Sequence, residues 1–159
     1  MIIKLTFLLL ALVMGKANAQ CNVQVNQRDD GVTVRYLRPD RIGFTDKLML
    51  ALSMQTNGEQ FFVSTLSVFQ TSAVKLKGNL TLKFTNNKSS TLKHFHSEIT
   101  TFNGLPATVS IFIADANCLN NISNSNVKMT MVQLSNNIFQ TISVKMNEDI
   151  LMKHYECLK

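Results

Sequence analysis

The sequence predicts an all-β protein, an antiparallel β-sandwich or a partly open barrel of about eight or nine strands with a short C-terminal helix. Three observations lead to this prediction. Apolar and polar residues alternate with a period of two along most of the chain, which is typical of strands rather than helices. Turn sequences rich in Asn and Gly separate the alternating segments. No long helical pattern lies between them, so neighbouring strands should run antiparallel.

Residues 1–19 have the three parts of a secretory signal. Lys4 supplies the positive start, Leu5 to Met14 form an apolar stretch, and Ala17-Asn18-Ala19 is a small-x-small cleavage site. The apolar stretch is too short to span a bilayer, which takes about 20 residues. We therefore expect residues 1–19 to be a signal peptide and residues 20–159 to form one exported domain, periplasmic or extracellular, without a transmembrane span.

Cys21 stands close to this cleavage site, where a lipid could be attached in a lipoprotein. A lipoprotein signal has a small residue directly before the modified Cys and an aliphatic residue three positions before it. Gln20 and Asn18 occupy these two positions, and neither residue type fits. We therefore expect plain cleavage before Gln20.

Composition and charge narrow the classes of function. The chain has 159 residues, 45% of them hydrophobic, which suffices for the core of one domain and excludes a disordered chain. It has 16 basic and 10 acidic residues, and because Lys4 and Lys16 lie in the signal, the remainder carries 14 against 10, a net charge of +4. This modest charge, together with export, argues against a nucleic-acid partner and leaves a protein or a glycan as the expected partner.

The first half of the domain predicts three strands. Val32 to Tyr36 alternates cleanly and should end before Pro39, which cannot donate to a strand ladder. Leu48 to Met54 places alternate apolar residues on one face. Asn57-Gly58 then predicts a two-residue hairpin loop leading into Phe61 to Phe69, with Met54 opposite Phe61.

The middle of the chain predicts a second hairpin and a central strand. Leu80 to Phe84 and Leu92 to Ile99 flank a polar turn. After Asn103-Gly104, Ala107 to Ala114 is a continuous β-branched and aromatic run that is typical of a central strand. Leu119 to Asn126 predicts a loop, because Asn and Ser dominate it.

A third hairpin is predicted around Asn136-Asn137, between the strands Val127 to Ser135 and Ile138 to Met146. If these two residues form the loop, Met131 lies opposite Ile142. Apolar residues then face apolar ones on one side of the hairpin, and polar residues face polar ones on the other. The methionines of this hairpin are accordingly expected to lie in the core.

The chain ends in a predicted helix that bears on the disulfide pairing. Asn147 can cap this helix, and the acidic residues after it suit a helix N-terminus. In an oxidising compartment Cys21, Cys118 and Cys157 should yield one disulfide and one free thiol, with three pairings open. We favour Cys21–Cys157, which ties both ends of the domain to the core while Cys118 stays buried. No histidine neighbours Cys118 in sequence, so a nucleophilic role is not expected.

One set of residues has spacing that suits a metal. On a strand, His94, His96 and Glu98 point to one face, and two imidazoles with a carboxylate are a legitimate zinc set. Alternate residues lie about 6.6–6.8 Å apart, so Glu98 is about 13 Å from His94 along the backbone. It would have to lean back or yield to another ligand, for which His154 is the remaining histidine.

The whole layout resembles that of small exported β-proteins of Gram-negative bacteria with no assigned function. The shared features are the signal, Cys21 near the mature start, the hairpins and a closing helix with Cys157 in its last turn. The resemblance implies a compartment and a fold type, but no site residues.

Two hypotheses for function follow. The first is a non-enzymatic exported domain without a cofactor, a binding or envelope-associated structural module whose loops, Arg35 to Asp46 or Leu119 to Asn126, contact a partner. The alternative is a zinc-binding protein or metallohydrolase centred on His94 and His96.

Overall fold

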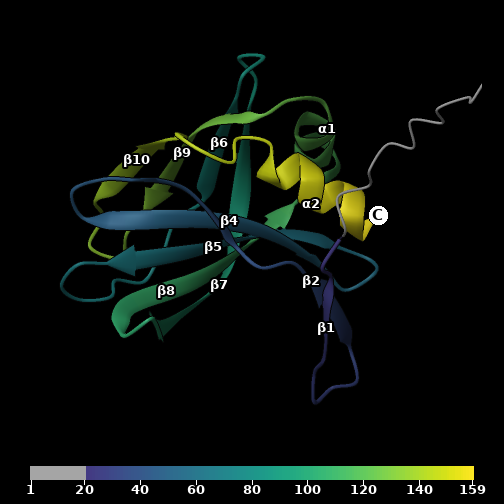
Figure 1. Ribbon diagram of the computed structural model, residues 1–159, viewed down its shortest axis with the longest axis horizontal. Helices are drawn as coiled ribbons and strands as arrows, with labels where there is room; N and C mark the ends of the chain where they lie inside the picture. Colours follow the sequence, from purple (N-terminus) through teal and green to yellow (C-terminus); the bar gives the residue numbers. More distant parts are fainter. Residues whose placement is uncertain (1–20) are drawn as a thin grey trace, which may run out of the picture.

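A computed structural model describes residues 21–159, so the predicted signal peptide lies outside the described residues. Ten strands and two helices make up this part of the chain (Figure 1). The elements are β1 (Gln24–Gln27), β2 (Thr33–Tyr36), β3 (Asp40–Phe44), β4 (Leu48–Thr56), β5 (Phe61–Phe69), β6 (Leu80–Phe84), β7 (Ser89–Phe102), β8 (Leu105–Ala114), α1 (Ala116–Asn124), β9 (Val127–Gln133), β10 (Phe139–Ser143) and α2 (Ile150–Leu158).

All ten strands belong to one antiparallel sheet with the order β1-β2-β4-β5-β8-β7-β6-β9-β10, and β3 pairs with β4 beside this path. The predicted all-β antiparallel class is therefore confirmed. The sheet does not close into a ring of ladders. Its nearest approach to closure is between β3 and the chain after β10, where the Lys145 N–H donates to the Ile42 carbonyl at 2.8 Å.

The core lies between the two ends of this folded sheet. In Figure 1, β6, β9 and β10 lie above β4 and β5, and both helices lie at one side of the space between them. Leu48, Leu50, Leu52 and Met54 of β4 point into this space and are at most 2% exposed, as their alternation predicts. They share one buried cluster with Leu82 and Phe84 of β6, Ile142 of β10 and Leu151 of α2. We call the sheet face that points into this core the inner face.

The C-terminal helix and its disulfide are both confirmed. Helix α2 buries Ile150, Leu151, His154 and Leu158 against the core, and Cys157 in its last turn is bonded to Cys21, with the two Cα atoms 5.6 Å apart. At the end of the helix the Arg35 guanidinium donates to the Leu158 carbonyl at 2.6 Å. A cation is favourable at this position, because the last carbonyls of a helix carry partial negative charge.

The segment predicted as a loop at Leu119 to Asn126 is instead helical over most of its length. Asp115 caps α1, and its carboxylate accepts the Cys118 N–H at 2.7 Å. Cys118 and Ile122, four positions apart on this helix, are both 1% exposed. The loop prediction is therefore wrong, because this cap and this apolar face outweigh the turn-forming composition.

The predicted register of the Asn136-Asn137 hairpin is wrong by one residue. The loop has three residues, since Leu134 donates to Ile138 at 2.9 Å, and Asn137 takes a φ of 63°. Type I turns with a following left-handed residue make such loops. The shift places Met131 opposite Thr141 rather than Ile142. Thr130 and Val132 therefore point into the core, and Met131 is 36% exposed.

The Asn57-Gly58 hairpin is also longer than predicted. Thr56 pairs with Phe61, so four residues form the loop, and Met54 lies opposite Val63 rather than Phe61. The Asn57 side-chain oxygen accepts the Gln60 N–H at 2.8 Å and holds the wider turn. This shift is two residues, so the predicted faces of both strands survive.

Asn103 and Gly104 form a two-residue loop between β7 and β8. Phe102 pairs with Leu105, and the two loop residues have φ values of 50° and 78°. Positive φ at both positions is what this tight loop requires, and Asn followed by Gly accepts it readily. This hairpin therefore fixes the register of β7 against β8.

Two strands were not predicted. β1 is almost entirely polar and pairs with β2 in a hairpin that projects from the rest of the sheet (Figure 1). β3 is short and carries Gly43, where an added Cβ would lie 2.6 Å from the Ser143 carbonyl oxygen. Glycine therefore lets β3 pass close to the end of β10. Within residues 21–159, neither helix has the length and apolarity needed to cross a membrane.

Candidate binding site

The sheet face opposite the core, which we call the outer face, is hollowed. Strands β4, β5, β8 and β7 place one row of side chains directly across this face, which comprises Ser53, Ser64, Ile111 and His96. The next row comprises Ala51, Leu66, Val109 and Glu98. The alternation of each strand therefore brings small hydroxyls, apolar side chains and titratable groups together on one surface.

Two hollows on the outer face share Tyr36 and Gln55 as lining residues, and we call them together the outer groove. The aromatic hollow has a volume of about 750 Å³ and includes Tyr36, Gln55, Phe62, Phe95, His96 and Glu98. The hydroxyl hollow has a volume of about 630 Å³ and includes Tyr36, Arg38, Ser53, Gln55, Ser64 and Phe102. Volumes of this size accommodate small ligands or segments of longer ones.

A β-bulge shapes the aromatic hollow. Between His94 and His96 the register of β7 against β8 shifts, so Phe95 is the extra residue of the bulge. Its ring remains 58% exposed and lies 5.6 Å from the ring of Phe62 on β5. Alternation from Leu92 and His94, which point inward, already directs Phe95 outward, and the bulge places His96 on the outer face beside it.

The same bulge directs the residues predicted to bind a metal to different faces of the sheet, although His94 and His96 still line one hollow of about 440 Å³ beside the bulge. His94 lies opposite Phe112, which points into the core, whereas His96 lies opposite Ile111 on the outer face. The expectation that His94, His96 and Glu98 share one face is therefore wrong, and only His96 and Glu98 line the aromatic hollow together. No group of three His, Cys, Asp or Glu side chains within residues 21–159 is placed to hold a metal ion. Metal binding through any of these residues stays a prediction.

His94 takes part in a partly buried hydroxyl network instead. Its Nε2 lies 2.7 Å from Ser97 Oγ, which also lies 2.6 Å from Ser110 Oγ and 3.0 Å from the Leu76 carbonyl. The carbonyl can only accept, so Ser97 donates to it and accepts from Ser110 and from His94 Nε2–H. Burial, with a smaller effect of His96, lowers the pKa of His94 and favours this neutral imidazole. The Ser97 hydroxyl therefore donates its proton to the Leu76 carbonyl, and His94 does not act as a base that would activate Ser97.

Cys118 is buried in α1, as predicted. Burial raises the pKa of its thiol to about 12, although a hydrogen bond to Ser90 partly offsets this effect. A thiol that stays protonated is a poor nucleophile. Its position therefore indicates a packing role.

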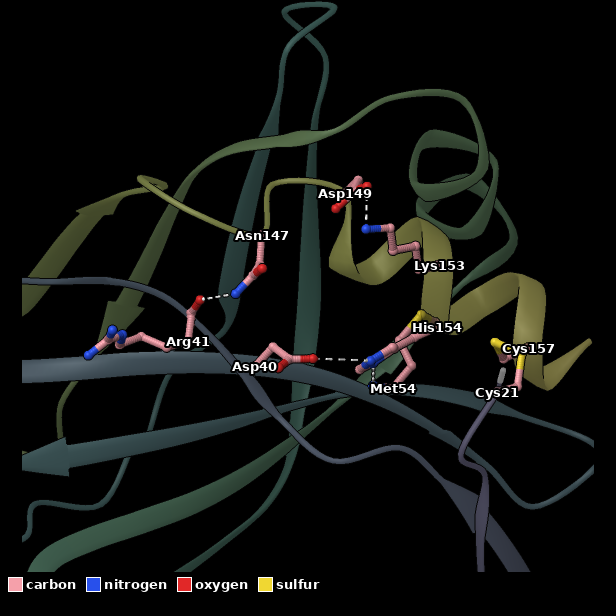
Figure 2. A network of polar contacts seen from close by, with 9 residues as sticks. All are labelled: Cys21, Asp40, Arg41, Met54, Asn147, Asp149, Lys153, His154 and Cys157. Atoms are coloured by element: carbon pink, nitrogen blue, oxygen red, sulfur yellow. Dashed lines mark hydrogen bonds and ion pairs between the residues drawn. A yellow bond between two sulfur atoms is a disulfide. The ribbon is translucent and has the colours of Figure 1, made fainter. Parts of the chain in front are cut away.

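His154 and the disulfide form a second polar cluster, at a hollow that shares Leu37 and Arg38 with the hydroxyl hollow. Figure 2 shows the His154 ring between Asp40 and the backbone of Met54, beside the bond from Cys21 to Cys157. His154 Nδ1 accepts the Met54 N–H at 3.3 Å, and Nε2 lies 3.8 Å from an Asp40 carboxylate oxygen. Burial lowers the pKa of His154, and the Asp40 carboxylate opposes this effect. The neutral ring therefore fastens α2 to β4.

One further contact joins this cluster to β3. The Asn147 amide donates to the Arg41 carbonyl at 2.8 Å, while Lys153 and Asp149 form an ion pair at 2.8 Å within α2 (Figure 2). Asn147 was predicted to cap α2, but the capping position belongs to Asp149. Asn147 instead has a left-handed backbone, with a φ of 51°, and turns the chain from β10 toward the helix.

Sequence reasoning missed the outer groove. The segment Arg35 to Asp46, predicted as a loop that carries a partner contact, instead contains the end of β2 and all of β3. It supplies Tyr36, Leu37, Arg38 and Pro39 to the hydroxyl hollow, and β4, β5, β7 and β8 supply the rest of the lining. The alternation shows that Ser64 and Phe62 share a face, yet nothing in it shows that this face is hollow. Comparisons with protein-family models, with curated proteins and with solved structures find no match for this chain.

Proposed function

We propose that this chain is an exported, non-enzymatic binding module and that its ligand lies in the outer groove. The observation that carries the proposal is that the aromatic and hydroxyl hollows adjoin at Tyr36 and Gln55 on the face of β4, β5, β8 and β7. Binding sites combine apolar and aromatic walls with a few polar groups that fix orientation, and this groove has both. The signal pattern and the disulfide support export, because disulfides persist in oxidising compartments.

The state of the nucleophilic residues supports binding rather than catalysis. Ser97 donates to a backbone carbonyl and Cys118 keeps its proton, so neither is activated. His96 and Glu98 do face the groove, but both lie on β7, and no hydrogen bond joins their side chains. The groove therefore supplies shape and contacts in place of an activated nucleophile.

Nuclear magnetic resonance of isotope-labelled residues 20–159 tests the proposal. Backbone amide shifts would be followed while a panel of soluble oligosaccharides and peptides is added. We expect the perturbed amides to cluster on β4, β5, β7 and β8 around Gln55 and Phe62, and a Tyr36→Ala/Phe62→Ala variant to lose the response. Perturbations confined to other surfaces, or a response that this variant retains, would contradict the proposal.

The second candidate is a zinc-binding protein or metallohydrolase. It is supported by His96 and Glu98, which face the same hollow and supply ligand types that zinc accepts. Zinc titration of chelator-stripped protein tests it. Micromolar binding that His96→Ala abolishes and His94→Ala retains would support this candidate, because only His96 faces the groove, and absence of binding would contradict it.

A further inference from the structure

We propose that the ligand of the outer groove is a neutral oligosaccharide that crosses β4, β5 and β8 and forms a hydrogen bond with Ser64. This inference rests on the proposed function and adds the chemical class of the ligand. It starts from a buried hydroxyl, on Ser64, that has no hydrogen-bond partner within the protein.

Ser64 carries that hydroxyl. It lies on the outer face of β5, lines the hydroxyl hollow and is only 8% exposed, yet its hydroxyl has no hydrogen-bond partner. Its neighbours across the sheet are Ser53 on β4 and Ile111 on β8. Thr65 and Ser67 of the same strand are also buried without a partner, but they face inward, opposite Leu52 and Leu50. Buried hydroxyls are nearly always paired, and the position of Ser64 on the outer face, at the hollow, points to a partner that arrives from that side.

The floor around Ser64 suits a ligand that carries many hydroxyls. Ser53, Gln55 and Thr100 also line the hydroxyl hollow, and each offers both donor and acceptor capacity without charge. Tyr36, which both hollows share, and Phe62 add aromatic ring faces. A sugar ring has hydroxyls at its edge and C–H groups on its faces, so it can use neutral hydrogen-bonding groups and aromatic rings together.

The pairing of the floor strands argues against a peptide. Extended peptides bind sheets by adding a strand at an edge, where backbone groups are free. β5 pairs with β4 and β8, and β8 pairs with β5 and β7, so the floor of the groove presents side chains and no free edge. A peptide lying on it would leave its own backbone groups without the ladder that normally binds them.

The charges along the groove favour a neutral sugar over an acidic one. Arg28, which lines the aromatic hollow, is paired with Asp30 at 3.0 Å. Arg38 lies at the hydroxyl hollow, whereas Glu98 lies at the aromatic hollow. One cation and one anion at different places do not make the cluster of cations that recognition of anionic sugars would use.

The width of the groove indicates several sugar rings. Its lining residues come from β2, β4, β5, β8 and β7, which are consecutive in the sheet. Neighbouring strands are about 4.8 Å apart, so the groove extends about 19 Å across them. A single sugar ring would occupy only part of this length, and the ligand is therefore an oligosaccharide or a segment of a polysaccharide.

Calorimetric titration of residues 20–159 with named neutral probes tests the inference. The probes are malto-, cello-, manno- and xylo-oligosaccharides, with oligogalacturonate as the acidic comparison. We expect at least one neutral probe to bind and Ser64→Ala to weaken it about two- to tenfold, the effect of losing one neutral hydrogen bond. Ser67→Ala is the matched control, because this hydroxyl is also buried and unpaired on β5 but faces inward opposite Leu50.

The outcomes separate this inference from the proposed function. Equal affinity of the Ser64→Ala and wild-type proteins for every neutral probe would overturn it. Binding of only oligogalacturonate or of a peptide, mapped by amide shifts to the groove, would overturn the neutral oligosaccharide while leaving the groove as the binding site. No amide shift in the groove with any probe would count against both. Thermal unfolding shows whether Ser64→Ala is folded, and we expect it to unfold no earlier than wild type, since an unpaired hydroxyl is removed.

Discussion

The two faces of the sheet formed by β4, β5, β8 and β7 differ in what lies against them. On β5, Val63 is fully buried in the core, whereas Phe62, one residue earlier, lines the outer groove. The inner face packs against β6, β9, β10 and α2, and the outer face opens to solvent through two hollows. The comparison shows how one alternating sequence can bury one face of a sheet in the core and leave the other face open to solvent.

A matched pair of phenylalanines should separate the two faces most strongly. Phe112 on β8 is 1% exposed in the core, and Phe95 on β7 is 58% exposed at the groove. We expect Phe112→Ala to lower the free energy of unfolding by about 3–5 kcal/mol through lost burial and a cavity. Phe95→Ala should cost less than about 1 kcal/mol, because its ring is largely solvated already.

Urea unfolding of both variants measures this difference. The same variants should show the opposite order in ligand affinity, with Phe95→Ala weakened and Phe112→Ala, where it folds, close to wild type. Similar losses of stability in the two variants would mean that the outer face is covered in solution and would remove the basis of the comparison.

Removing the disulfide tests how helix α2 is held against the inner face of the sheet. Cys21→Ser/Cys157→Ser frees α2 from the start of the domain, and loss of a native disulfide in a small domain costs about 2–5 kcal/mol. We expect this loss in urea unfolding at neutral pH. Cys118→Ala is the control, since that thiol is free. Unchanged stability of the double variant would show that α2 is held by packing alone.

Protonation of His154 should also weaken the attachment of α2, with a smaller loss in the free energy of unfolding. The folded protein lowers the pKa of His154 from its ordinary value of 6.5, because burial disfavours the charged ring by more than the Asp40 carboxylate favours it. The unfolded chain therefore binds the proton more readily. The free energy of unfolding should be at its full value above the ordinary pKa and decline as the pH falls below it.

Urea unfolding between about pH 7.5 and about pH 5 measures this decline. His94 also has a lowered pKa and contributes in the same direction, so the two histidines must be separated. His154→Gln should flatten part of the pH dependence, and His94→Gln another part. A His154→Gln variant with the full wild-type pH dependence would contradict the role given to this ring.

The hairpins show which parts of the fold the sequence can predict. At Asn103-Gly104 the loop has two residues, because Gly at the second position makes a doubly left-handed turn favourable. At Asn136-Asn137 only Asn137 has positive φ, and Ser135 joins the loop. One additional loop residue reverses the faces of a strand, so Met131 moves from the predicted core to the surface.

Other errors have causes that lie outside the local pattern. Helix α1 was missed because its composition is mostly polar. The cap at Asp115 and the burial of two apolar residues, Cys118 and Ile122, stabilise it as a helix. The bulge at Phe95 is an irregularity that alternation does not encode, and it separated His94 from His96. The groove could not be predicted at all, since its shape depends on how five strands lie together in the sheet. The Cys21–Cys157 disulfide could be predicted, because pairing these two cysteines ties both ends of the domain to the core.

The bond between Cys21 and Cys157 encloses almost all of the described chain in one covalent ring, since its two cysteines are 136 positions apart. Every strand and both walls of the outer groove lie inside this ring. Proteases cut exposed loops, and a single cut in any loop of this domain would open the ring without releasing a fragment. A nicked molecule would therefore remain one molecule until it is reduced, with both halves of its groove still attached.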